Sequence, residues 1–287
     1  MSHPVKGVDH AFIMVDDLDD AAERYRALGF TLSPRGLHSA AKGSANYTIM
    51  FPEDYFELLG ILAPTPGNAP RRAMLEKCGQ GLHAVACRID DAAKGAASLG
   101  ELGIATYGLG DFQRPVPLPG GGEGIAAFST VSFAPEEVPT GIVFMCQHKT
   151  RETVWLPELM THANTAIGLD AVIARSSAPE ADGARMARLF AAGNVKAEGG
   201  VAEVTTGPNS APILMMDEAA LAAAYPGVDL AKTPTGAFTA LRLRVSDLSA
   251  AIKVLAKAGI PHSRTSRGVA AAPEACSGAI IEFVPAG

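Results

Sequence analysis

Short apolar runs alternate with amphipathic segments along the chain, and the first such pair sets the pattern. Residues 8–15 form an apolar run that is interrupted near its start by one His, which is typical of a mostly buried β-strand. The next segment has apolar residues at helical spacing (Ala21, Tyr25 and Leu28), acidic residues in its first turn, and Gly29 at its end. This pattern predicts a strand followed directly by a helix.

The same pattern recurs three more times. The further copies cover residues 81–103, 168–193 and 238–259. In each copy, one residue aligns with His10 and one glycine ends the helix, and the number of residues between them is similar. These pairs are His10 and Gly29, His83 and Gly103, Asp170 and Gly193, and Ala240 and Gly259. These similar spacings indicate four repeated modules.

Further β-forming runs follow each helix. They cover residues 46–51 and 55–61, then 126–133 and 141–148, then 201–205 and 212–216, and finally 278–284. Turn residues separate them, as between strands of a hairpin. Each module is therefore expected to be βαβββ-like, in an α+β fold.

This repeat resembles the vicinal-oxygen-chelate superfamily, and the run from Gly43 to Leu59 is similar to its glyoxalase-like-domain proteins. The resemblance covers nearly the whole chain. It implies that the four modules pair into two glyoxalase/dioxygenase-like domains, each with a U-shaped sheet. In that superfamily the sheet surrounds one metal, with ligands from the first and last strands of both modules.

The expected domain organisation follows from this pairing. Residues 1–148 would form the first domain with the metal site, and residues 167–287 a second, degenerate copy that stabilises the first or helps to build a homodimer. Residues 149–166 hold the only Trp and several apolar residues, so we expect an ordered connector packed on the first domain.

Composition narrows the choice of partners and compartment. A net charge of −6 and a pI near 5.7 argue against a nucleic-acid or acidic-membrane partner, because both require a basic surface. The first residues lack the apolar core of a signal peptide, and the four cysteines show no paired spacing. We expect a cytoplasmic protein with a small-molecule substrate.

Three residues form the expected metal site. His10 and His83 hold matched repeat positions, although a lone His in an apolar strand is usually a hydrogen-bonded core residue. Glu57 lies inside an apolar strand, where a carboxylate needs a positive partner. Two imidazoles and a carboxylate would hold a divalent cation with open positions for substrate oxygens, and the residues do not distinguish Zn, Ni, Fe, Mn and Co.

The resemblance implies a fourth ligand, usually Glu, from the last strand of the second module, and in lactoylglutathione lyases this acid doubles as the catalytic base. Here that strand ends in Gln147 and His148, and strand alternation lets only one of them face inward. Counting from Gly141, as Gly278 leads to Glu282, places Gln147 inward. A β-bulge would bring in His148 instead. Both alternatives stay open.

Other residues complete the expected site. Asn46 could hydrogen-bond substrate, and Trp155 and His162 could reach the pocket from the connector. Two function hypotheses follow. The first is a metalloenzyme in which the cation acts as a Lewis acid on an enediolate-type intermediate (lyase or isomerase) or supports ring-cleaving dioxygenation, with Glu57 or a bound hydroxide moving the proton. The second is a metal-free protein that binds and sequesters a small molecule.

Overall fold

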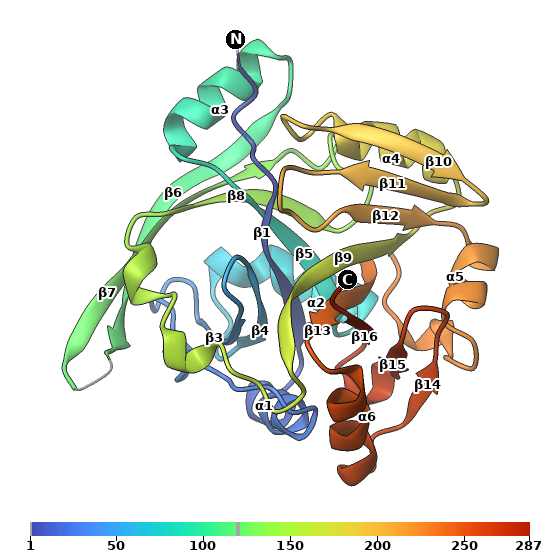
Figure 1. Cartoon of the computed structure of the whole chain (residues 1–287). Coiled ribbons are helices and arrows are strands. Elements are labelled where there is room, and N and C mark those ends of the chain that lie inside the picture. The colour runs from blue at the N-terminus through green and yellow to red at the C-terminus, as the bar shows by residue number, and fades with distance from the viewer. Residues whose placement is uncertain (1, 119–120) are drawn as a thin grey trace.

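Two eight-stranded mixed sheets of identical topology organise the chain (Figure 1). The computed structural model describes residues 2–118 and 121–287. The first sheet has the order β2-β3-β4-β1-β5-β8-β7-β6, and the second has the order β10-β11-β12-β9-β13-β16-β15-β14. Modules one and two therefore share one sheet, and modules three and four share the other. The predicted α+β fold of four paired modules is confirmed.

The strands of the first sheet are β1 (Val8–Val15), β2 (Gly36–Leu37), β3 (Ser44–Met50), β4 (Tyr55–Ile61), β5 (Gly81–Arg88), β6 (Thr106–Pro117), β7 (Glu123–Phe133) and β8 (Ile142–His148). Those of the second are β9 (Ala166–Arg175), β10 (Asn194–Glu198), β11 (Val201–Thr205), β12 (Ile213–Met216), β13 (Phe238–Val245), β14 (His262–Arg264), β15 (Val269–Ala271) and β16 (Ile280–Pro285). The α-helices are α1 (Leu18–Ala27), α2 (Ala69–Cys78), α3 (Ala92–Glu101), α4 (Pro179–Ala187), α5 (Glu218–Ala224) and α6 (Leu248–Lys257).

Each module closes on itself in the same way. Its first strand pairs in parallel with its last strand, as β1 does with β4 and β5 with β8. The two modules of a sheet then meet where their first strands run antiparallel, at β1 and β5 and at β9 and β13. The side chains of Asp17, Asp91 and Asp247 cap the helices that follow β1, β5 and β13.

One apolar core joins the two sheets. It gathers buried residues from α1, α3, α4 and α6 together with one face of each sheet. At its centre the rings of Phe30 and Phe283 stack with centroids 5.9 Å apart, and the Tyr25 hydroxyl donates to the Cys276 carbonyl at 3.0 Å. Because these contacts cross between the halves, each sheet stabilises the other.

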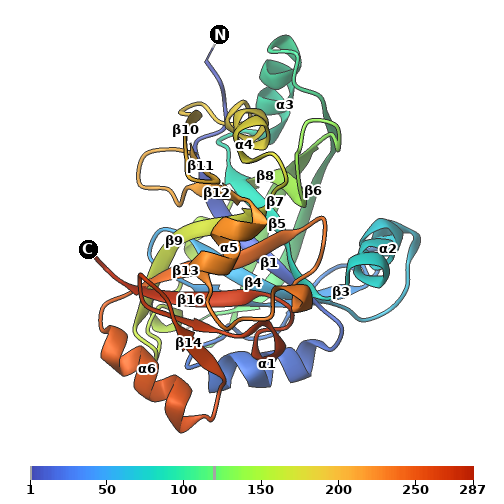
Figure 2. The same cartoon turned by 90° about the vertical axis from the view of Figure 1, so that its right-hand side faces the viewer.

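The opposite faces of the sheets differ in what covers them. In the second sheet, Leu221 and Tyr225 at α5 belong to a buried apolar cluster with residues of β9, β12 and β13. In the first sheet, Trp155, Leu159 and Met160 of the connector pack at one end, and α2 stands to the side with no buried residue (Figure 2). A cavity lies on this face of the first sheet. No helix in the described part of the chain is long and apolar enough to cross a membrane.

Candidate active site

A β-bulge next to His10 shapes the site. In the β1–β5 ladder, Val8 lies opposite Cys87 and His10 lies opposite Ala86, so Asp9 is the extra residue on β1. On β5 the extra residue is His83. The second sheet repeats both bulges, with Asp170 and Thr239 as the extra residues.

The expected equivalence of His10 and His83 is therefore wrong by one residue. The bulges align His83 with Asp9, and they align His10 with Ala84. The sequence held a signal for this, because His10 precedes the helix cap Asp17 by seven residues, as Ala84 precedes Asp91. Counting back from the helix cap gives the correct match. The final glycine gives the same match, because Gly29 follows His10 by 19 residues and Gly103 follows Ala84 by 19 residues.

His83 is fully buried and does not line the cavity. Its Nε2 donates to the Gly79 carbonyl at 2.7 Å, and burial lowers the pKa of its imidazole. Its Nδ1 has no hydrogen-bond partner in residues 2–118 and 121–287. The structure thus separates His83 from the histidine with which it was expected to share a metal.

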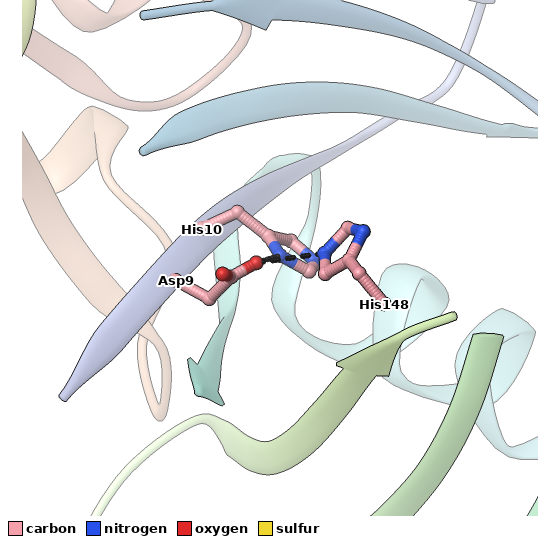
Figure 3. A group of neighbouring side chains, drawn as sticks. All are labelled: Asp9, His10 and His148. Atoms are coloured by element: carbon pink, nitrogen blue, oxygen red, sulfur yellow. Dashed lines mark hydrogen bonds and ion pairs between the residues drawn. The ribbon is translucent and has the colours of Figure 1, made fainter. Parts of the chain in front are cut away.

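The bulge instead brings together two consecutive side chains. Neighbours in a regular strand point to opposite faces, but here His10 Nδ1 lies 2.9 Å from Asp9 Oδ2 (Figure 3). His148 Nε2 reaches the same oxygen from β8, also at 2.9 Å. On the other carboxylate oxygen, Arg88 Nε lies 3.7 Å from Oδ1. Asp9 is thus the centre of a buried cluster with two histidines.

The charge on Asp9 is stabilised by these neighbours. Burial alone would raise the pKa of the carboxyl group, but hydrogen bonds from His10 and His148 and their charges lower it well below its usual range. An ionised carboxylate only accepts hydrogen bonds, so each histidine presents an N–H to it. The remaining ring nitrogens, Nε2 of His10 and Nδ1 of His148, have no hydrogen-bond partner within residues 2–118 and 121–287.

His148 faces this cluster because β8 alternates regularly. Phe144 and Cys146 line the cavity, and His148 continues the same face. Gln147 points the other way, where its Oε1 accepts from the backbone N–H of Ala92 at the start of α3. The count that placed Gln147 inward is wrong because the strand register matches Glu282 with Phe144, and not with Met145.

The cavity lies beside His10. The His10 ring is one of its walls and stacks on Tyr55 with centroids 4.2 Å apart. Glu57 and Asn46 line it as well, and the Asn46 amide donates to the Glu57 carboxylate. The charged and aromatic residues that complete the lining are His38, Lys42, Arg71, Arg114, Phe12, Phe112, Phe128 and Phe144. Of the expected site residues, His10, Glu57 and Asn46 meet here.

The two connector residues lie outside the cavity lining. Trp155 packs edge-on against His148, with ring centroids 4.9 Å apart, and so covers the buried cluster. His162 is held by backbone groups, because its Nδ1 accepts from Thr31 N at 3.0 Å and its Nε2 donates to the Met50 carbonyl at 2.9 Å. With both nitrogens engaged, His162 links the connector to β3.

The sequence profile of the glyoxalase-like domain family matches residues 8–190. The chain belongs to this glyoxalase-like family. A search among curated proteins finds no match.

Three solved structures show the same fold at low identity. A hypothetical protein from Staphylococcus aureus is 14% identical, with 97% of this chain and 99% of that chain covered and a TM-score of 0.67. A mutant of 4-hydroxymandelate synthase from Streptomyces coelicolor is 16% identical, with 91% and 77% covered and a TM-score of 0.53. A xylose isomerase-like TIM barrel/4-hydroxyphenylpyruvate dioxygenase fusion protein is 13% identical, with 100% and 50% covered and a TM-score of 0.59.

Members of this superfamily usually bind a divalent metal, and this glyoxalase-like protein has one candidate donor set in its described residues. The ligand atoms of Asp9, His10 and His148 all lie within 4.8 Å of one another. Two imidazoles and a carboxylate are suitable donors for such an ion. Glu57 is not part of this set, and of the three donors only His10 lines the cavity. A cation held there would sit beneath the cavity wall.

Proposed function

We propose that this glyoxalase-like protein is an enzyme of the lyase or isomerase type that moves a proton on a small oxygenated substrate. His10 would be the general base, with Asp9 as its positioning residue. The observation that carries the proposal is a cavity-lining imidazole whose Nδ1–H is held by a buried carboxylate. A carboxylate in that position fixes the tautomer, leaves Nε2 as the basic nitrogen, and stabilises the imidazolium that forms.

The proposed step is a proton abstraction next to a carbonyl group. Nε2 of His10 takes the proton from a hydroxyl-bearing carbon beside the carbonyl. The electron pair of the broken C–H bond forms a carbon–carbon double bond as the π pair of the carbonyl moves onto its oxygen, which gives an enediolate-type intermediate. Cationic donors of the cavity would stabilise that oxygen. The imidazolium then returns the proton to the neighbouring carbon or oxygen, so that no external oxidant or reductant is needed.

Proton exchange in heavy water tests this role. We expect the protein to catalyse deuterium exchange at the carbon beside a carbonyl or hydroxyl group in a panel of small 2-oxo and 2-hydroxy compounds. His10→Gln should abolish exchange, and Asp9→Asn should reduce it by orders of magnitude, because Asn can hold the wrong tautomer. His262→Gln is the matched control at an exposed site. Tight binding of a compound without exchange would instead support a sequestering protein.

A second candidate is a metal-dependent enzyme, which the donor set of Asp9, His10 and His148 favours. A divalent cation held by these residues would supply Lewis-acid chemistry. In that case Tyr55 and Trp155 would position the histidines through their ring contacts. Elemental analysis of protein purified without a histidine tag, followed by exchange assays after chelation, separates the candidates: exchange that survives complete metal removal excludes the second.

A further inference from the structure

Three cationic side chains enter the cavity from three separate segments. Lys42 comes from the turn before β3, Arg71 from α2, and Arg114 from β6. In the described ranges, 2–118 and 121–287, no acidic group lies within ion-pair distance of any of the three, whereas Arg88, Arg175 and Arg242 all have such partners. The cavity therefore contains three cations that have no ion-pair partner among the described residues.

The single carboxylate of the cavity does not balance them. Among the described residues of the lining, Glu57 is the only acidic one, against three cations, and its Oε2 is already bonded to the amide of Asn46. The lining thus carries a formal excess of two positive charges at neutral pH, inside a chain whose net charge is −6. This local charge is opposite in sign to that of the whole protein.

Aromatic rings contact Lys42 and Arg71, and the absence of a side chain at Gly36 leaves room for Arg114. Lys42 Nζ lies 3.2 Å from the ring centroid of Phe112, and Arg71 Cζ lies 5.7 Å from that of Phe12. Gly36 gives Arg114 its room, because a Cβ built on Gly36 would lie 2.7 Å from Arg114 Cζ. Aromatic contacts stabilise a cation without neutralising it, so the charges remain available to a ligand.

The pKa values of two basic groups in the cavity reflect this charge. Burial, followed by the charges of Lys42, Arg114 and Arg71, lowers the pKa of His38 to about 3. Burial and the charge of Arg71 lower the pKa of Lys42 to about 8, despite the opposing effect of Glu57. Burial is the larger cause of both shifts, and the neighbouring cations add to it more than Glu57 offsets.

We propose that the substrate carries a dianionic group, either a pair of carboxylates or a phosphate monoester, which Lys42, Arg71 and Arg114 bind in the cavity beside His10. Two guanidinium groups suit this ligand, because each can donate two parallel hydrogen bonds to a carboxylate or a phosphate. The proposal rests on the proposed function only in calling the ligand a substrate, because the binding of the anion requires no chemistry.

Calorimetric titration of the full chain with malonate, inorganic phosphate and acetate tests the inference. We expect malonate or phosphate to bind at least tenfold more tightly than acetate, a difference of about 1.4 kcal/mol. Preference for malonate identifies a dicarboxylate, and preference for phosphate identifies a phosphate monoester. Equal, weak binding of all three probes would overturn the proposal.

Matched variants locate the site. Arg71→Gln and Arg114→Gln should each weaken dianion binding at least tenfold, whereas Arg72→Gln, on the same helix but outside the cavity lining, should leave it unchanged. A similar loss in all three variants would contradict the assignment. His10→Gln should retain dianion binding and lose proton exchange. Dianion binding without exchange in the unmodified protein would leave the anion site standing and refute the proposed reaction.

Discussion

Glu57 and Glu282 occupy equivalent positions in the last strands of the first and fourth modules. Glu57 on β4 lies opposite Phe12 of β1, and Glu282 on β16 lies opposite Arg242 of β13. In the second sheet the carboxylate is saturated, since it accepts from Arg242 Nε at 2.6 Å, the Tyr225 hydroxyl at 3.1 Å and the Thr265 hydroxyl at 2.6 Å. This module position thus holds an internal ion pair in the fourth module, whereas in the first module it lines the cavity.

This difference predicts a stability effect confined to the second sheet. Glu282→Gln removes the nearest counter-charge of the buried Arg242 and leaves it with Asp170, whose Oδ2 lies 3.8 Å from Arg242 Nη1. The loss should cost about 3–5 kcal/mol of unfolding free energy. Arg242→Met combined with Glu282→Leu should cost much less, because neither charge remains. Urea unfolding measures both, with the exposed Arg185→Gln as the control. Equal losses in the single and double variants would refute this account.

The stability of the protein should depend on the ionisation of Asp54. Burial raises the pKa of this carboxyl group to about 6, although the bond from Leu169 N and the charges of Arg244 and Arg88 oppose the shift. The folded state then binds a proton more tightly than the unfolded state, so this group's contribution to stability decreases as the pH rises from about 4 to 6.

Asp54→Asn tests this directly. The amide oxygen can still accept the bond from Leu169 N, so the variant should melt at a higher temperature than the unmodified protein at pH 7.5 and close to it at pH 4. Thermal melts across this range provide the measurement. A variant that is less stable at pH 7.5 would mean that Arg88 and Arg244 outweigh burial.

Metal binding, where it is detected, should follow the Asp9 cluster. His148→Ala should weaken it by more than tenfold, or about 1.4 kcal/mol, because an imidazole donor is lost. Gln147→Glu should change it little, since Gln147 faces α3. Titration with zinc and cobalt gives the affinities. Tighter metal binding by the Gln147→Glu variant would mean that the side chain at this position faces the metal site.

The space above Gly36 should control the anion site. Gly36→Ala would place a Cβ 2.3 Å from Asn46 Oδ1 and 2.7 Å from Arg114 Cζ, so one of these side chains must move. We expect dianion affinity to fall several-fold with little change in melting temperature. Gly100→Ala is the control, because nothing lies within 4 Å of its added Cβ. An unchanged affinity would mean that Arg114 binds from another position.

Local pattern was sufficient to predict the modules and to place His10 in a buried strand, but not to predict the partners of His10. The helices, their Asp caps and the apolar strands are encoded over short stretches, so the repeat could be read directly. Asp9 was also visible, as an acid beside a His in an apolar run, yet its role depends on a bulge that a hydrophobic pattern does not reveal. An alignment anchored on the helix caps would have matched it with His83.

The cations of the cavity had no comparable signal. Arg71 lies on α2, a helix outside the βαβββ repeat, and Arg114 lies on the long strand β6. They converge only when strands distant in sequence are paired, which single-sequence periodicity does not specify. In the sequence, Arg71 and Arg72 are the only two adjacent cationic residues.

The bulge also bears on how such a site could arise. It occurs in all four modules of this chain, including the two whose following residue is Ala171 or Ala240. The backbone that turns two consecutive side chains toward each other is thus common to all four modules. Only the first module has an acid followed by a histidine at these two positions. In an ancestor built by duplication, a new acid–base pair would have required two substitutions on a scaffold already shaped to receive them.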